Sequence, residues 1–112
     1  MPTLELIDSQ GTVIYNSNDT APDGGTVLDY VGQYETVNVV GLGFDPNTVV
    51  YWSNGTETVN PLGSSTVGTN GVTSAFQLPT TNLGLQMIIG FEIAVDGSAT
   101  QASTTYDVLP GR

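Results

Sequence analysis

The stretch from Val37 to Trp52 constrains the fold more than any other part of the chain, because it predicts two β-strands joined by a sharp bend. Residues 37–40 read Val-Asn-Val-Val and residues 48–52 read Thr-Val-Val-Tyr-Trp, and both runs are rich in β-forming residues. Between them, the sequences Gly-Leu-Gly-Phe and Asp-Pro-Asn supply residues that favour turns. We interpret the stretch as the corner of a β-sandwich.

Turn signals divide the rest of the chain into short β-prone segments. Segments 3–7 and 12–16 flank the sequence Asp-Ser-Gln-Gly and predict an N-terminal hairpin, whereas 16–25 is rich in Asn, Ser, Asp, Pro and Gly and predicts a loop. Further along, we expect 56–60 to be a strand, 61–65 a break and 66–69 a short strand. No segment has the periodicity of an amphipathic helix, so we predict an all-β protein. Seven to nine antiparallel strands in two sheets is the favoured architecture, and a small barrel is the alternative.

Two later segments carry the longest alternations of apolar residues. In the first, the odd positions are apolar, namely Leu85, Met87, Ile89, Phe91, Ile93 and Val95. We predict that this row faces the core, which would make Phe91 one of the most damaging positions to truncate. In the second, an inward row is predicted at Ala102, Thr104, Tyr106 and Val108.

The length of 112 residues suits one domain with one core. We assign 1–25 to an N-terminal hairpin and loop and 26–112 to the sandwich core. No long apolar run predicts membrane insertion, and the residues after Met1 lack the basic and apolar parts of a secretory signal. There is no cysteine, so neither a disulfide nor thiolate chemistry is expected.

The charge distribution is unusual, with eleven acidic residues, no Lys or His, and Arg112 as the one basic residue. Without basic side chains the chain has no groups to neutralise phosphates, which argues against nucleic acid and anionic lipid as direct partners. With a net charge of −10, we expect stability to rise with salt, as suits a halophilic or saline habitat.

From about Thr36 to Val108, the chain resembles the immunoglobulin-like modules, akin to the IPT/TIG type, that recur in prokaryotic surface proteins and in phage or virus decoration proteins. The resemblance rests on the Gly-Leu-Gly-Phe corner at 41–44, Pro-Asn at 46–47, the Asn-Gly strand from 70 to Pro79, and the terminal strands from 85 to 108. It implies an immunoglobulin-like sandwich. It also implies a spacer, stalk or decoration role rather than an enzymatic one.

The sequence offers little for catalysis, because no His, Lys or Cys is present to activate a Ser or Thr nucleophile. A carboxylate pair among Glu35, Glu57 and Glu92 could in principle hydrolyse a glycoside, but their spacing does not favour it. We expect no enzymatic activity and no cofactor.

Two kinds of ligand have candidate residues. Calcium could be bound by the oxygen-rich loop residues Asn16, Asn18, Asp19 and Asp23, although an ordinary Asx-rich loop is the simpler interpretation. A glycan could be attached at the Asn-x-Thr triplets that begin at residues 18 and 54. A sugar could also stack on exposed aromatics, for which the candidates are Tyr30, Tyr34, Tyr51, Trp52 and Tyr106, with Trp52 better explained as core.

Together these features favour a non-enzymatic structural module on a virion surface or another extracellular surface, foremost a capsid decoration protein. The alternatives are a pilus, S-layer or other cell-surface domain of an archaeon or bacterium, and a carbohydrate-binding module. The expected partners are protein subunits of a capsid or surface lattice, including further copies of the chain. We predict assembly contacts by the β-prone leader, through Leu4, Leu6, Val13 and Tyr15.

Overall fold

The computed structural model describes residues 2–11, 13–16, 30–54, 61–93 and 99–110, and within these ranges every regular element is a β-strand. The all-β prediction is therefore confirmed. The strands are β1 (Thr3–Asp8), β2 (Val13–Asn16), β3 (Tyr30–Gly32), β4 (Val37–Leu42), β5 (Val49–Ser53), β6 (Gly63–Thr66), β7 (Phe76–Gln77), β8 (Gly84–Ile93) and β9 (Ala99–Leu109).

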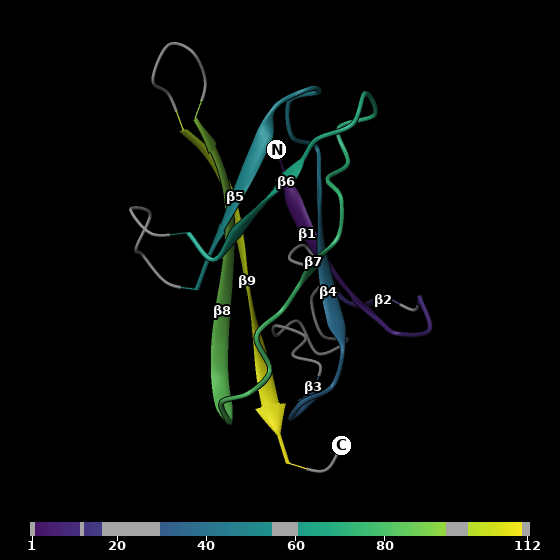
Figure 1. The fold of residues 1–112 in the computed structure, drawn as a ribbon, viewed down its shortest axis with the longest axis vertical. Coiled ribbons are helices and arrows are strands. Elements are labelled where there is room, and N and C mark those ends of the chain that lie inside the picture. Colours follow the sequence, from purple (N-terminus) through teal and green to yellow (C-terminus); the bar gives the residue numbers. More distant parts are fainter. Residues whose placement is uncertain (1, 12, 17–29, 55–60, 94–98, 111–112) are drawn as a thin grey trace, which may run out of the picture.

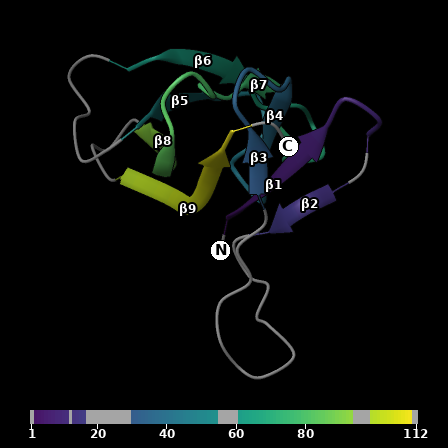
Figure 2. The ribbon, with the colours of Figure 1, turned by 90° about the horizontal axis from the view of Figure 1, so that it is seen from below.

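The strands form two sheets, as the two views in Figures 1 and 2 show. One sheet has four strands in the order β2-β1-β4-β7, and the other has five in the order β3-β9-β8-β5-β6. The longest strands, β8 and β9, pair along their whole length. The prediction of antiparallel strands holds for every pair of named strands except β3 and β9, which run parallel.

The corner predicted at 41–48 is confirmed, since β4 belongs to the four-stranded sheet and β5 to the five-stranded sheet. Gly43 has a φ of 79°, in the left-handed region that glycine adopts without strain. The ring of Phe44 folds back over Gly41 and is almost fully buried, so it fills the space inside the bend. Asn47, also left-handed with a φ of 63°, completes the turn into β5.

The core lies between the sheets and is centred on Trp52, which has no exposed surface. Its indole lies directly over Gly90, where a Cβ would come within 2.6 Å of the ring. Phe76, from the other sheet, stacks on the indole at a centroid distance of 5.8 Å. The indole Nε1 donates to the hydroxyl of Ser65 at 2.9 Å, so the one polar atom of this side chain is satisfied inside the core.

The inward row predicted for β9 is confirmed, because its four members are all buried and three of them belong to the core cluster. The prediction for β8 is wrong about the row that joins the core cluster, because Ile88 belongs to that cluster and Leu85 and Met87 are exposed. Ile89 and Phe91 are buried, with 8% and 5% of their surface exposed, but they lie outside the cluster. Ile88 opposes Thr104 and Gly90 opposes both Ala102 and Trp52, so the even positions share the inner face. Cross-strand partners point to the same side of a sheet, and this fixes the row of β8 regardless of its hydrophobic pattern.

Two further expectations change at the local level. The segment 61–65 was expected to be a break, but Gly63 to Thr66 form β6 and pair with β5. The leader was expected to stand in front of the core, but β1 is an inner strand that pairs with both β2 and β4. The expected strand at 56–60 lies outside the described residues.

Candidate functional site

The calcium candidates are placed only in part. Asn16 ends β2, whereas Asn18, Asp19 and Asp23 lie outside the described residues. Among the residues that the structure describes, no group of three or more acidic, His or Cys side chains could hold a metal ion. The described part also has no helix with the length and hydropathy needed to cross a membrane.

The carboxylates considered for catalysis do not converge. Glu57 lies outside the described residues. Glu92 opposes Thr100 at one end of the β8–β9 ladder, whereas the turn that carries Glu35 adjoins Leu109 at the other end, through the bond from Gln33 N to Leu109 O. Eight residues of extended chain separate Gly84 from Glu92, or about 26 Å, compared with about 5 to 10 Å between paired glycosidase carboxylates. Each carboxylate instead supports its own loop: Glu35 accepts from Gly32 N and Glu92 accepts from the Thr48 hydroxyl.

The residues predicted to mediate assembly lie in strands β1 and β2 of the sandwich. Leu4 and Leu6 have no exposed surface and belong to the core cluster, so within the chain they stabilise the fold and do not present a surface. Tyr15 opposes Leu6 and Val13 opposes Ile7 across the β1–β2 ladder. The edge strands of the four-stranded sheet are therefore β2 and β7, and β1 is not available to a neighbour.

The structure describes the burial of four of the aromatic candidates, of which two are buried and two are exposed. Trp52 is core, as expected, and Tyr106 is buried with its hydroxyl donating to Pro79 O at 2.8 Å. Burial raises the pKa of the Tyr106 phenol from 10.0 to about 12, since the charged form is disfavoured away from water. Tyr51 is partly exposed, and Tyr34, with 75% of its surface exposed, is the most exposed of the described large hydrophobic side chains.

Tyr34 is held in an unusual backbone conformation. It occupies the third position of a turn closed by the bond from Glu35 N to Gly32 O, with a φ of 66°. Glycine is the residue expected at such a position, and a bulky side chain there costs about 1 kcal/mol or more. Tyr34 N donates to Thr80 O and the Thr80 hydroxyl donates to Glu35 O, so the turn is fixed against the segment that precedes β8.

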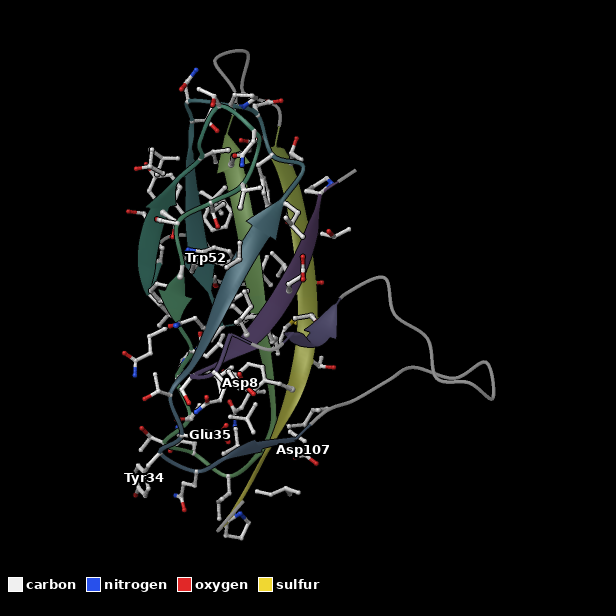
Figure 3. All side chains as sticks on the ribbon, turned by 90° about the vertical axis from the view of Figure 1, so that its right-hand side faces the viewer. Asp8, Tyr34, Glu35, Trp52 and Asp107 are labelled. Carbon is white, nitrogen blue, oxygen red and sulfur yellow. The ribbon has the colours of Figure 1, made fainter. Side chains whose placement is uncertain are left out.

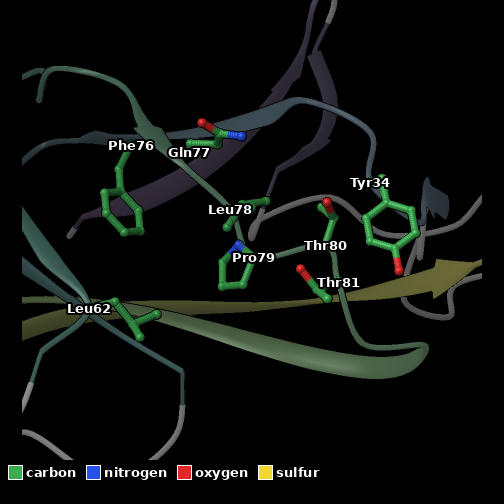
Figure 4. Close-up of a pocket in the computed structure, with 8 residues that line it drawn as sticks. All are labelled: Tyr34, Leu62, Phe76, Gln77, Leu78, Pro79, Thr80 and Thr81. Atoms are coloured by element: carbon green, nitrogen blue, oxygen red, sulfur yellow. The ribbon is translucent and has the colours of Figure 1, made fainter.

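A groove of about 420 Å³ runs from Tyr34 to Leu62, with residues 76–81 between them (Figure 4). Its described lining consists of aromatic, aliphatic and neutral polar side chains and includes no charged residue. The segment that lines it is attached to the inner side of the five-stranded sheet by the bond from Tyr106 to Pro79 and by the bond from Gln86 Nε2 to Asn82 O at 3.3 Å. The groove therefore lies beside the first half of β8.

The outer face of the five-stranded sheet carries a second unusual feature, an apolar stripe along β5 and β8. It consists of Val49, Tyr51, Leu85, Met87, Ile89 and Phe91, of which the first four are 40%, 38%, 63% and 38% exposed and the last two are buried, at 8% and 5%. The rings of Tyr51 and Phe91 contact each other at a centroid distance of 5.7 Å. We call these six residues the outer stripe.

Hydroxyl side chains border the outer stripe on both sides. Ser64 and Thr66 on β6 oppose the β5 members, and Ser103 and Thr105 on β9 oppose the β8 members. Of the described acidic residues, only Asp107 lies among the outward positions of these four strands. A face with an apolar centre, a neutral polar border and little charge has the anatomy of a protein interface.

The sequence contained a signal for the outer stripe that a prediction from alternating apolar and polar positions does not detect. Residues 49–52 read Val-Val-Tyr-Trp and residues 87–89 read Met-Ile-Ile, so these strands are apolar on both faces. Such a strand has one face in the core and leaves a second apolar face to be covered. The left-handed turn at Tyr34 had no comparable signal, because tyrosine is not a residue that predicts a positive φ.

Comparisons with known proteins found no match, whether against protein-family models, curated proteins or solved structures.

Proposed function

We propose that the protein is a non-enzymatic structural module that assembles by packing its outer stripe against the outer stripe of a second copy. The observation that carries this proposal is the exposure of Leu85, Met87, Tyr51 and Val49 on a single nearly uncharged sheet face. Ile89 and Phe91, which are buried, lie between the exposed β8 pair and the exposed β5 pair. Large apolar side chains exposed on one face mark interaction surfaces in folded proteins.

The charge of the chain restricts where a second copy can dock, and the outer stripe lies on a face with little of that charge. Each copy has a net charge of −10, so most approaches between copies are repulsive at low salt. The outer stripe is bordered by neutral hydroxyl groups, and Asp107 is the one described carboxylate among these outward positions. Two copies that meet at this face bring their apolar centres together while keeping most of their described carboxylates away from the interface.

The dimensions of the face suit a contact that needs support from a lattice. β8 has ten residues and is about 33 Å long, and four strands at about 4.8 Å spacing are roughly 15 Å wide. Each copy would contribute roughly 500 Å², for a total of roughly 1,000 Å², which is the lower bound for a specific interface. We therefore expect reversible, concentration-dependent association of the isolated protein.

The setting that we favour is the surface of a virion, where the module would act as a decoration protein. The absence of lysine, the abundance of Thr, Val, Gly, Asn and Ser, and the β-sandwich support an exterior role. The alternative setting is a cell-surface, pilus or S-layer assembly. Electron microscopy of the native particle or filament, labelled with an antibody against the protein, would distinguish capsids from cell envelopes.

Sedimentation velocity over a range of concentrations tests the contact itself. We expect the wild-type protein to self-associate, and we expect Met87→Asp to abolish association because it places a charge in the outer stripe of both partners. Leu62→Asp is the matched control, since Leu62 is similarly exposed, at 45%, but lies in the groove. A wild-type protein that stays monomeric at millimolar concentration, or equal association of the two variants, would refute the proposed contact.

A further inference from the structure

The first half of β8 has an open edge. β5 ends at Ser53, which opposes Ile89, so among the described residues no strand pairs with Gly84 to Ile88 on the side away from β9. This edge also lacks the usual protection of a lysine, a proline or a bulge, because the five residues read Gly-Leu-Gln-Met-Ile.

The direction of the backbone groups on this edge follows from the neighbouring ladders. Trp52 O accepts from Leu62 N, on the β6 side, so the adjacent residues Tyr51 and Ser53 direct their backbone groups towards β8. Their partners on β8 are Phe91 and Ile89, both odd-numbered. By the same alternation, the N–H and C=O groups of Leu85 and Met87 point out of the open edge.

The groove adjoins this edge and gives it a chemical preference. A segment added antiparallel to β8 would continue the line of β5, with one row of side chains beside Leu85 and Met87 and the other towards the uncharged groove between Leu62 and Pro79. Both rows would meet mainly apolar surface. Such a segment should therefore be extended and apolar on both faces.

The end of the groove at Tyr34 adds a requirement for charge. Glu35 and Asp107 lie at this end of the molecule, together with the exposed ring of Tyr34 (Figure 3). Two carboxylates and an exposed aromatic ring attract a cation. Because the segment runs antiparallel to β8, its C-terminal end is the one that reaches Tyr34.

We propose that the open edge of β8 and the adjoining groove bind an extended apolar peptide segment of another protein by strand addition, with an Arg or Lys at its C-terminal end. The segment belongs to a different protein because Arg112 is the one basic residue of this chain, and the residues that precede it, Ala99–Leu109, already form β9. This site shares Leu85 and Met87 with the outer stripe. Peptide binding is therefore tested at a concentration where the chain is monomeric, so that its failure and the failure of the contact between copies are distinguishable.

The test uses the synthetic peptide acetyl-Thr-Val-Ile-Val-Thr-Arg-amide and the full chain at a concentration where it is monomeric. We expect amide chemical-shift changes at Leu85 and Met87 and at least tenfold slower hydrogen exchange of these two amides at saturation. A peptide with Pro in place of Ile, which removes a ladder donor, and a peptide with Glu in place of Arg should each bind about tenfold more weakly or worse.

Two variants report on the protein side of the contact. Leu85→Pro removes an N–H that pairs with no strand among the described residues, and we expect it to lose peptide binding. Tyr34→Gly relieves the left-handed backbone and should remain folded, while its preference for the Arg peptide over the Glu peptide falls. If Leu85→Pro does not fold, the peptide comparisons with the wild-type chain decide the matter.

Three results would overturn the proposal. The first is the absence of shift changes at millimolar peptide, and the second is equal binding of the Pro-containing peptide. The third is a set of shift changes at Val49, Tyr51 and Phe91 without slower exchange of the Leu85 and Met87 amides, which would indicate nonspecific apolar adsorption to the outer stripe.

Discussion

The two faces of β8 differ in their position, one towards the core and one towards the outside, and the apolarity of their side chains does not predict which is which. The outward face carries the larger apolar side chains, including Leu85, Met87 and Phe91, whereas the inward face has Gly90 and the buried carboxylate of Glu92 beside Ile88. The inward face is nevertheless the core face, because Gly90 leaves room for Trp52. The comparison teaches that the volume filled by a neighbouring strand, and not the apolarity of a row, decides which face of this strand is inside.

The largest expected difference between the faces is at two adjacent residues of β5. Trp52→Ala empties the centre of the core and should lower the free energy of unfolding by about 3 to 5 kcal/mol. Tyr51→Ala removes a side chain that is 38% exposed and contacts Phe91, so it should cost less than about 2 kcal/mol. Urea denaturation of monomeric samples measures both values. Equal losses would mean that the two faces are equivalent.

A closer comparison is possible within β8 itself. Ile88→Ala removes a fully buried member of the core cluster and should cost about 2 to 5 kcal/mol. Ile89→Ala removes the same atoms from the outer stripe, where 8% of the residue is exposed, and should cost about 2 kcal/mol, because the lost burial is not accompanied by a cavity in the core cluster. The two variants are chemically identical, so chemical denaturation compares position alone. A greater loss of unfolding free energy in Ile89→Ala than in Ile88→Ala would indicate that the odd-numbered residues of β8 face the core.

The inner face also contains an ionisable group whose response to pH can be predicted. Tyr106 has a pKa of about 12 in the folded chain and near 10.0 when unfolded. Its contribution to stability is therefore complete below pH 10 and is lost as the pH rises from 10 towards 12. Tyr106→Phe should cost about 1 kcal/mol at pH 7, through the lost bond to Pro79 O, and should flatten the alkaline loss. Thermal melts between pH 7 and 12 test this, and an unchanged alkaline slope in the variant would contradict it.

Salt should affect both the fold and the outer stripe, but by the smallest amount. Screening of a net charge of −10 at molar NaCl should stabilise the monomer by about 1 kcal/mol or less. The same screening should strengthen association between outer stripes. Melting temperatures and sedimentation profiles at low and molar NaCl measure the two effects, and weaker association at high salt would show that the contact is ionic.

Much of the fold could be predicted from local sequence. The corner at 41–48 has glycines and turn residues at positions that require them, and β9 alternates buried Ala102, Tyr106 and Val108 with polar residues. Both features depend on residues close together in the chain. The all-β class and the sandwich corner followed from them.

The face of β8 could not be predicted in the same way, because it depends on the register with β5 and β9. Gly90 opposes Trp52 across 38 positions of sequence, and nothing local to either residue fixes that pairing. The leader is a different case, since Leu4 and Leu6 already form an apolar row that suits a core. Their burial was accessible from the sequence, and the expectation of an assembly role passed over it.

The candidate sites were the least predictable part of the molecule. The groove brings together Tyr34, Leu62 and the segment 76–81, which come from three separate parts of the chain. Among the described residues, β8 has an open edge because β5 ends opposite Ile89 and leaves the part of β8 from Gly84 to Ile88 without a strand beside it. Sites of this kind arise from unequal strand lengths and from register, which hydrophobic periodicity does not encode.

The most direct test of the two-faced β8 uses the absence of cysteine from the chain. Met87→Cys and Ile88→Cys each introduce one thiol, at adjacent positions on opposite faces. Reaction with a thiol reagent such as dithiobisnitrobenzoate, followed on the folded monomer, measures the exposure of each. We predict rapid reaction at position 87, protection at position 88 until the protein unfolds, and slower reaction at position 87 as concentration rises and outer stripes meet. Rapid reaction at 88 with protection at 87 would contradict the account.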